Sequence, residues 1–395
     1  MHFPLPHPVL QLLGTLHKAG HEAFLVGGCV RDLLRGQPPK DYDVATRALP
    51  SEVQACFPRT VPTGIQHGTV TVLLGKSAFE VTTYRSEGDY EDGRRPRQVH
   101  FHTSIEEDLS RRDFTINAMA YAPLENRWVD PWGGQEDLRK NLVRCVGNPL
   151  QRFAEDGLRA LRAVRFAATL NFALDTDTQS AIGQRLDVFA KVSAERIREE
   201  FLKLLACAHA QRGLQLLLST GLLHRFLPEA TAADFATATR PPGLLARLAL
   251  LLASAPSPRA ALQRLKFSNK QLETVLHLLA VQPPPPCHAD ETALRRWLSK
   301  AQEAHWEEAL SLGEALEGRA EEEALASRMH ALLALHPALS INKLALRGEE
   351  VGLILGIPPG PQVGEALRFL LEKVLENPRL NSAESLSQLL QTWNK

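Results

Sequence analysis

The spacing of apolar residues changes near residue 150, and this change limits the folds open to the chain. Up to about residue 140, segments alternate between the two-residue period of strands and the longer period of amphipathic helices. Residues 68–75 and 79–85 read as two strands joined by a short turn. From about residue 150 onward Leu, Ala, Arg and Glu recur at helical spacing. The pattern predicts a small α/β head followed by a long all-α region.

The bulk properties indicate a multidomain globular protein. A chain of 395 residues is too long for one compact core. Hydrophobic residues make up 44% and charged residues 23%, which is typical of soluble proteins, and no apolar segment is long enough to span a bilayer. The N-terminus lacks the features of a signal peptide. The five cysteines are scattered, with no Cys-x-x-Cys pair, which argues against a zinc site or disulfide framework and favours the reducing cytoplasm.

A Gly-Gly pair separates a strand-like segment from a helix-like one between residues 24 and 46. The apolar run 24–26 has strand character, and Gly27 and Gly28 end it. Arg31 lies in the first turn of the helix that follows. Backbone N–H groups at such a turn can meet an anion, and the guanidinium of Arg31 can reach a phosphate.

Two alternating aspartates follow in the sequence "KDYDVAT". Side chains two apart in a strand point the same way, so Asp41 and Asp43 are expected to project from one face. Two carboxylates can share Mg²⁺, which usually lies between carboxylates and substrate phosphates. Either motif alone is weak, since Gly-Gly is often only a turn. Together and in this order they predict a nucleoside-triphosphate site with a metal.

The stretch from "LVGGCVRDLL" to "DYDVAT" closely resembles the nucleotidyltransferase motif of class II of the DNA polymerase beta superfamily, which includes tRNA CCA-adding enzymes and bacterial poly(A) polymerases. The resemblance implies an α+β fold, with a nucleotidyltransferase head built on a mixed sheet with helices and an all-α neck, body and tail. The implied boundaries are 1–140 for the head, 141–210 for the neck, 211–285 for the body and 286–395 for the tail.

The resemblance also implies a third catalytic carboxylate beside Asp41 and Asp43. It falls on Glu80, a polar residue among the apolar and β-branched residues of "FEVTTYR". Without the resemblance, Glu80 reads as an exposed strand glutamate. The expected metal ligands are Asp41 and Asp43, and the expected cofactor is Mg²⁺.

Arg111, Arg112 and Asp113 precede the apolar segment "FTINAMAY", which is expected to begin a helix. An Arg pair beside an Asp can bind phosphate and a ribose hydroxyl, although Asp also suits a helix cap. The resemblance implies that this motif contacts the ribose and selects NTP over dNTP. Asn117, in the apolar segment, is a further nucleotide-binding candidate.

The stretch "EDGLRALRAVRFAA" places Asp156 and Arg159 three apart on an expected helix, with Arg162 and Arg165 continuing the row. The spacing alone indicates an ion pair of about 0.2–0.5 kcal/mol on an amphipathic helix. The stretch also resembles the family's EDxxR motif, in which an Asp and an Arg bond to the edge of the incoming base. The resemblance implies that Asp156 and Arg159 read the base and that Glu155 orients Arg159. Arg162 and Arg165 are expected to assist in nucleotide binding.

Cytosine and adenine suit such a pair, because both offer an amino donor beside a ring-nitrogen acceptor. Guanine and uracil present a carbonyl where the amino group should be. They would leave a buried carboxylate unpaired, a mismatch that costs more than a lost apolar contact.

Residues 85–101 form a polar, charged segment that is expected to be a loop. It resembles the flexible loop that helps CCA-adding enzymes move from C addition to A addition. The matching positions include Arg85, Tyr90, Asp92 and Arg94.

The resemblance implies template-independent addition of CCA to tRNA from CTP and ATP, with no DNA or membrane partner. An A-only enzyme that works with a separate CC-adding partner keeps the same motifs and stays open. A poly(A) polymerase fits less well, because the chain lacks both a "GRRF"-like stretch after the first motif and a basic C-terminal extension. A catalytically inactive RNA-binding module and a nucleotidyltransferase that modifies proteins or drugs are alternatives of other classes.

Overall fold

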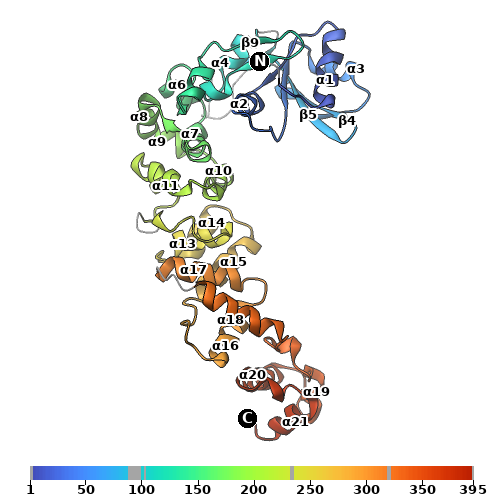
Figure 1. The fold of residues 1–395 in the computed structure, drawn as a ribbon, viewed down its shortest axis with the longest axis vertical. Helices are drawn as coiled ribbons and strands as arrows, with labels where there is room; N and C mark the ends of the chain where they lie inside the picture. Colours follow the sequence, from blue (N-terminus) through green and yellow to red (C-terminus); the bar gives the residue numbers. More distant parts are fainter. Residues whose placement is uncertain (1–2, 88–98, 102–103, 232–234, 318–321, 394–395) are drawn as a thin grey trace. The chain divides into compact units, whose positions relative to one another are not determined.

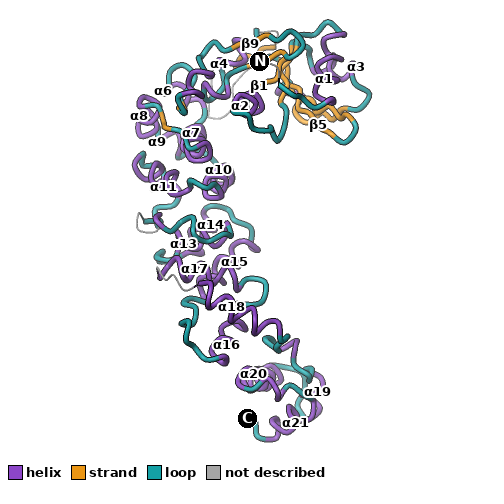
Figure 2. The backbone as a smooth tube through the Cα atoms, viewed as in Figure 1, coloured by secondary structure: helices purple, strands orange, loops and turns teal. Residues whose placement is uncertain are grey.

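The computed structural model describes residues 3–87, 99–101, 104–231, 235–317 and 322–393 (Figure 1). The chain divides into two compact units, Met1–Pro228 and Glu229–Lys395. The strands of the described residues all belong to the first unit, and the second unit is helical (Figure 2). The predicted α+β architecture, a head with a mixed sheet followed by helices, is confirmed.

A seven-stranded sheet forms the centre of the head, in the order β3-β4-β5-β2-β1-β8-β9. Its strands are β1 (Ala23–Val26), β2 (Asp43–Thr46), β3 (Thr60–Gly64), β4 (Thr69–Leu74), β5 (Ser77–Thr83), β8 (Ala120–Ala122) and β9 (Arg127–Val129). Strands β2 and β5 pair in parallel and the other neighbours pair antiparallel, so the sheet is mixed. The expected hairpin of β4 and β5 is present.

Helices cover the sheet because its strands alternate buried side chains between two faces. Phe24 and Val26 of β1 share a core cluster with Ile105 and Leu109 of α4 (Ile105–Ser110). Leu25 points the opposite way and is fully buried. Helix α1 (His7–Lys18) packs on β1 and on α3 (Pro50–Cys56), which in turn packs on β4 and β5. The shorter helices α2 (Gly28–Leu34) and α5 (Gly134–Arg139) complete the head.

The helix expected to start in "FTINAMAY" is absent from the structure, and that expectation is wrong. Residues Thr115–Asn117 form one 3-10 turn, and the chain then enters strand β8. Tyr121 pairs with Leu25 of β1, and the whole of β8 is buried. A short, fully buried apolar run has no polar face, so its periodicity does not separate strand from helix.

The rest of the first unit is mostly helical. Its remaining elements are α6 (Pro149–Glu155), α7 (Leu158–Leu170), α8 (Thr176–Gln184), α9 (Leu186–Phe189), α10 (Ala194–Ala206), α11 (Ala210–Ser219) and α12 (Leu223–Phe226), with the short strand pairs β6 (Arg85–Glu87) and β7 (Val99–Phe101), and β10 (Leu142–Val143) and β11 (Ala173–Leu174). The pair β10 and β11 shows that strand structure extends slightly past residue 150.

Asp156 does not lie on a helix with Arg159, contrary to the sequence-based expectation. It lies between α6 and α7, and its Oδ1 accepts a hydrogen bond from the backbone N–H of Leu158 at 3.0 Å. The break falls at Gly157, where a Cβ atom would lie 2.7 Å from the carbonyl oxygen of Val188. Close approach of α9 therefore requires glycine here, and the turn redirects the chain.

The second unit consists of α13 (Leu244–Leu252), α14 (Pro258–Arg264), α15 (Asn269–Ala280), α16 (Glu291–Ala301), α17 (Trp306–Glu317), α18 (Glu322–Ala334), α19 (Gly348–Leu355), α20 (Pro361–Glu376) and α21 (Ala383–Gln391). Helices α19, α20 and α21 share one core cluster that includes Val351, Leu370 and Leu386. Among the described residues, none of the helices combines the length and the apolar character needed to cross a membrane.

We predict that Gly134→Ala destabilises the protein, whereas Gly14→Ala does not. A Cβ at Gly134 would lie 2.2 Å from the carbonyl oxygen of Thr115, so overpacking should cost about 1–3 kcal/mol. A Cβ at Gly14, inside α1, meets nothing within 4 Å, so alanine should add roughly 0.5–1 kcal/mol through helix propensity. Thermal melting of both variants checks this. Equal midpoints would contradict the tight contact at Gly134.

Candidate functional site

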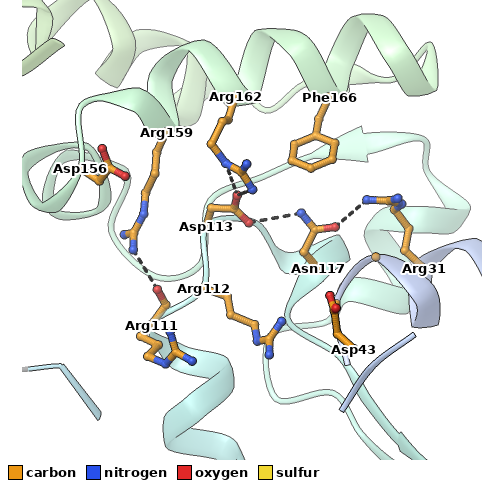
Figure 3. A pocket seen from close by; sticks show the side chains of 12 residues that line it. Arg31, Asp43, Arg111, Arg112, Asp113, Asn117, Asp156, Arg159, Arg162 and Phe166 are labelled. Carbon is orange, nitrogen blue, oxygen red and sulfur yellow. Dashed lines mark hydrogen bonds and ion pairs between the residues drawn. The ribbon is translucent and has the colours of Figure 1, made fainter. Parts of the chain in front are cut away.

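A cavity of about 350 Å³ lies in the first unit and gathers residues from four separate segments (Figure 3). Its lining consists of Gly27, Gly28, Arg31, Asp43, Arg111, Arg112, Asp113, Asn117, Asp156, Arg159, Arg162 and Phe166. Eleven of these twelve were candidates from the sequence, and Phe166 is the addition. Asp41, Glu80, Arg85, Glu155 and Arg165 were also candidates, and they do not line the cavity.

The Gly-Gly turn forms one wall of the cavity. Gly27 has a φ of 74°, in the left-handed region that favours glycine, and it precedes the first turn of α2. A Cβ atom there would also lie 3.0 Å from Nη1 of Arg112. Arg31 donates from Nη1 to Oδ1 of Asn117 at 2.8 Å and from Nε to Asp32. Glycine therefore opens the space into which the arginine side chains reach.

The carboxylates of Asp41 and Glu80 lie close enough to Asp43, which lines the cavity, to affect its pKa. Asp43 begins β2, and the parallel register of Val44 with Val81 sets Glu80 of β5 at the same level on the neighbouring strand. Asp41 precedes β2 and is not part of it, so strand alternation does not place it. Desolvation raises the pKa of Asp43, Arg112 opposes that rise, and the charges of Glu80 and Asp41 add to it.

The carboxylates of Asp41 and Asp43 are oxygen donors of the kind that a divalent cation takes. Within the ranges that the structure describes, no group of three or more His, Cys, Asp or Glu side chains is arranged to hold a metal. Mg²⁺, however, commonly takes one or two carboxylates and completes its shell with water and substrate phosphates. Desolvation is the main cause of the raised pKa of Asp43, and the charges of Glu80 and Asp41 add to it, so a bound cation would favour the ionised carboxylate. The pair Asp41 and Asp43 therefore fits a cation that binds together with a triphosphate.

Arg111 and Arg112 are both held by Asp108, a residue that the sequence analysis did not single out. The side chain of Asp108 is only 1% exposed, and its Oδ1 accepts from Nη2 of Arg111 at 2.7 Å while its Oδ2 accepts from Nη2 of Arg112 at 3.2 Å. Burial alone would raise the pKa of Asp108, but the two guanidinium groups lower it. Asp108 precedes Arg111 by three residues and Arg112 by four, and this helical spacing could have indicated both ion pairs from the sequence.

Asp113 is the centre of a hydrogen-bond network across the cavity. Its Oδ2 accepts from Nε of Arg162 at 2.9 Å, and its Oδ1 accepts from Nδ2 of Asn117 at 3.2 Å. Asn117 is bonded to Arg31, so the network runs from α2 to α7 (Figure 3). Burial opposes ionisation of Asp113, yet Arg162 and Asn117 lower its pKa to about 2.

Arg159 is held in place by hydrogen bonds from its guanidinium. Nη1 donates to Oε2 of Glu155 at 2.5 Å and to the carbonyl of Arg152 at 3.3 Å, and Nη2 donates to the carbonyl of Arg111 at 3.0 Å. The contact between Glu155 and Arg159 matches the expectation from the sequence. Figure 3 shows that Arg159 extends from α7 toward the segment that carries Arg111.

Asp156 and Arg165 are held by side chains of helix α10, and local sequence spacing did not indicate these contacts. The carboxylate of Asp156 is paired with Arg196, with Nη2 and Oδ2 2.7 Å apart. Arg165 donates to Oε2 of Glu200 at 2.6 Å. Each partner is more than thirty residues away in the chain. Local spacing reveals helix faces and gives no information on such contacts.

Phe166 lies among cationic side chains. The guanidinium carbons of Arg31 and Arg162 each lie 5.4 Å from the centre of its ring, within the range of a cation–π interaction. The ring therefore adds an apolar surface to a cavity whose other walls are mostly charged.

The expected flexible loop is described only at its edges. Arg85 donates from Nη1 to the backbone carbonyl of His67. Tyr90, Asp92 and Arg94 lie outside the described residues.

We predict that the ionised form of Asp113 supports the fold above about pH 4. Its folded pKa lies near 2 and its usual value is 3.8, so the unfolded chain takes up the proton first and this support is lost as pH falls from 4 toward 2. The difference corresponds to roughly 2 kcal/mol. Asp113→Asn should therefore melt below the wild type at pH 6, and the gap should narrow at pH 3. A gap that stays constant with pH would contradict the assignment.

Family models match most of the chain. The model described as "Poly A polymerase head domain" matches residues 23–144. The model described as "Probable RNA and SrmB- binding site of polymerase A" matches residues 171–234. A model of tRNA nucleotidyltransferase domain 2 matches residues 244–390.

Several relatives are similar over nearly their full length. The CCA-adding enzyme of Geobacillus thermodenitrificans is 41% identical over 394 residues, 96% of each chain. The CCA-adding enzyme of Geobacillus stearothermophilus is 39% identical and covers 98% of this chain and 96% of its own. The crystal structure of the Bacillus stearothermophilus CCA-adding enzyme in complex with CTP covers 98% of both chains, with a TM-score of 0.87 and 34% identity. The Thermotoga maritima CCA-adding enzyme complexed with tRNA has a TM-score of 0.69 at 20% identity, covers 98% of this chain and 96% of its own, and shows a common fold.

Proposed function

The chain belongs to the family of CCA-adding tRNA nucleotidyltransferases, and we propose that it adds the 3′-terminal CCA to tRNA from CTP and ATP without a template. The observation that carries this proposal is that one cavity combines an aspartate at the start of the central strand β2, a Gly-Gly turn, several arginines and the pair Asp156 and Arg159. The crystallised relative at 34% identity is a CTP complex.

The triphosphate is proposed to bind at the Gly-Gly turn. Gly27 and Gly28 leave the backbone N–H groups accessible, and Arg31 stands beside them. Nε of Arg112 is buried and makes no hydrogen bond within the described residues. A buried donor without a partner is costly, so a phosphate oxygen is a suitable acceptor for it.

The ribose is proposed to bind beside Arg111, Arg112 and Asp113. Asp113 already accepts bonds from Arg162 and Asn117, so its main contribution is to hold those two side chains in place. Asn117, whose side chain bonds to both Arg31 and Asp113, then lies between the proposed phosphate site and the proposed sugar site.

Asp156 and Arg159 are proposed to read the base. The carboxylate of Asp156 accepts the amino group of cytosine or adenine, and the guanidinium of Arg159 donates to the adjacent ring nitrogen. Uracil and guanine place a carbonyl against the carboxylate and leave it unpaired, which is strongly unfavourable in a desolvated site. The protein thus serves as its own template for C and A.

The family implies a divalent metal, and we propose Mg²⁺ held by Asp41 and Asp43, with Glu80 as the third carboxylate of the catalytic set. A bound cation of this kind supplies Lewis-acid stabilisation of developing negative charge. In the proposed reaction the RNA 3′-hydroxyl oxygen forms a bond to the α-phosphorus as the bond from that phosphorus to the bridging oxygen breaks. The hydroxyl proton is released and pyrophosphate leaves, with Arg31 and Arg112 stabilising its charge.

The proposal extends to organisation and location. The head (1–140), neck (141–210), body (211–285) and tail (286–395) remain our proposed division, in which the helical parts bind tRNA through phosphates and shape. We propose a cytoplasmic location, because all five cysteines are free thiols. The loop that includes Arg85, Tyr90, Asp92 and Arg94 is proposed to act in the final A addition.

We predict that Asp43→Ala abolishes incorporation of both CTP and ATP. Loss of several kcal/mol of charge stabilisation corresponds to at least about a thousandfold fall in rate. Primer extension with radiolabelled tRNA measures it, and melting together with tRNA binding by gel shift controls for folding. Asp187→Ala, which removes an exposed carboxylate outside the cavity, should stay near the wild-type rate. Near-normal turnover by Asp43→Ala would refute the site assignment.

A set of three tRNA transcripts distinguishes the candidate activities. The transcripts end at the discriminator base, at C and at CC, and each is offered CTP, ATP or both. We expect the first to gain two residues with CTP alone and three with both nucleotides. An A-only enzyme would leave the first two unextended with CTP and add one A to the third. Long tails from ATP on all three would indicate a poly(A) polymerase.

A further inference from the structure

We propose that Arg196 is a positioning residue for nucleotide selection, acting through the carboxylate of Asp156. The inference rests on the proposed function, because it names the group that orients the proposed base-reading side chain. Arg196 lies on α10 and does not line the cavity. Its contribution is therefore indirect, through the geometry that it gives to Asp156.

The backbone at Asp156 is fixed by packing on α9. A Cβ at Gly157, the next residue, would lie 2.7 Å from the carbonyl oxygen of Val188 and 2.8 Å from the amide nitrogen of Phe189. The backbone N–H of Asp156 also donates to the carbonyl of Arg152, at 3.5 Å. With the backbone held, the rotation of the side chain is the remaining freedom of the carboxylate.

Arg196 restricts the rotation of the Asp156 side chain through a bidentate contact with its carboxylate. Nη1 donates to Oδ1 of Asp156 at 3.2 Å and Nη2 donates to Oδ2 at 2.7 Å. Two parallel bonds fix the plane of a carboxylate, which a single bond does not. Both side chains are largely shielded, with 25% of Arg196 and 17% of Asp156 exposed, so water competes weakly for these bonds.

These contacts use most of the hydrogen-bond acceptor positions of the Asp156 carboxylate, but not all of them. A carboxylate offers about four acceptor directions. Oδ1 of Asp156 accepts from the N–H of Leu158 and from Arg196, whereas Oδ2 accepts from Arg196. Oδ2 thus keeps one direction for an amino group of the incoming base. Uracil and guanine would place a carbonyl oxygen there. Because a carbonyl oxygen and Oδ2 both accept hydrogen bonds, no bond can form between them.

Helix α10, which carries Arg196, is bound by an ion pair to helix α7, which carries Arg159. Glu200, one turn after Arg196, is 4% exposed and accepts from Arg165 of α7 at 2.6 Å and from Lys203 at 3.0 Å. The arginines around it lower the pKa of Glu200 although burial opposes this, so the pair stays charged. The two groups proposed to face the base are thereby held at a fixed separation.

Single-nucleotide kinetics with the full chain test the proposal. Purified wild type, Arg196→Ala, Arg196→Lys and the control Arg198→Ala are given the discriminator-ended and CC-ended transcripts with each of CTP, ATP, UTP and GTP. Arg198 is the matched control because residues two apart on a helix do not face the same way. Melting curves establish that each variant is folded.

We expect Arg196→Ala to lower kcat/KM for CTP and ATP about tenfold to a hundredfold, as expected for a misplaced reactive contact. Its preference for CTP and ATP over UTP and GTP should fall at least tenfold. Arg196→Lys should be intermediate, because an ammonium lacks the planar fork. Arg198→Ala should match the wild type.

A double mutant separates positioning from general support of the fold. If Arg196 acts through Asp156, Arg196→Ala should cause no further loss of discrimination in an Asp156→Ala background. A further tenfold loss in the double mutant would overturn the proposal, as would full discrimination by the single variant. If Arg196→Ala does not fold, Arg196→Gln is compared with Arg196→Lys in its place. Equal preference of these two variants for CTP and ATP over UTP and GTP would overturn the proposal. Absence of C and A preference in the wild type itself would instead refute the proposed function.

Discussion

The ion pair between Asp113 and Arg162 is the interaction on which the cavity depends. It joins the segment after α4, which belongs to the head, to helix α7, which carries Arg159 and Arg162. Through Asn117 the same carboxylate is connected to Arg31 at the Gly-Gly turn. A buried charge without its partner is costly, so Asp113 and Arg162 constrain each other's position. The wall at the Gly-Gly turn and the wall formed by α7 are therefore held in one geometry.

Two aspartates of this cavity have opposite electrostatic character, because their pKa values shift in opposite directions. Asp113 is surrounded by donors and has a pKa of about 2. Asp43 has its pKa raised by desolvation and by two neighbouring carboxylates, with only Arg112 in opposition. A carboxylate surrounded by protein donors is stabilised in its charged form, whereas a desolvated carboxylate beside other carboxylates would gain from a bound cation.

The chemistry-bearing residues were largely predictable from the sequence, because glycines, paired aspartates and arginines at short spacing are local signals. The hairpin of β4 and β5 and the Gly-Gly turn agree with those signals. Three local assignments failed. Asp41 was expected to share a strand with Asp43, but it precedes β2. The segment "FTINAMAY" leads into the buried strand β8, which pairs with β1, and does not begin a helix. Asp156 lies between two helices because α9 packs so closely on Gly157 that no side chain fits there.

The sequence by itself determined the α+β architecture, the order of its motifs and the residue types of the cavity, since each depends on neighbours within about a dozen positions. Only the tertiary structure decided which partners hold those residues. Asp156 meets Arg196 forty positions away, and Arg162 meets Asp113 forty-nine positions away. Such pairs arise because buried charges must find counter-charges wherever packing brings the helices together, and no period in the sequence records that choice.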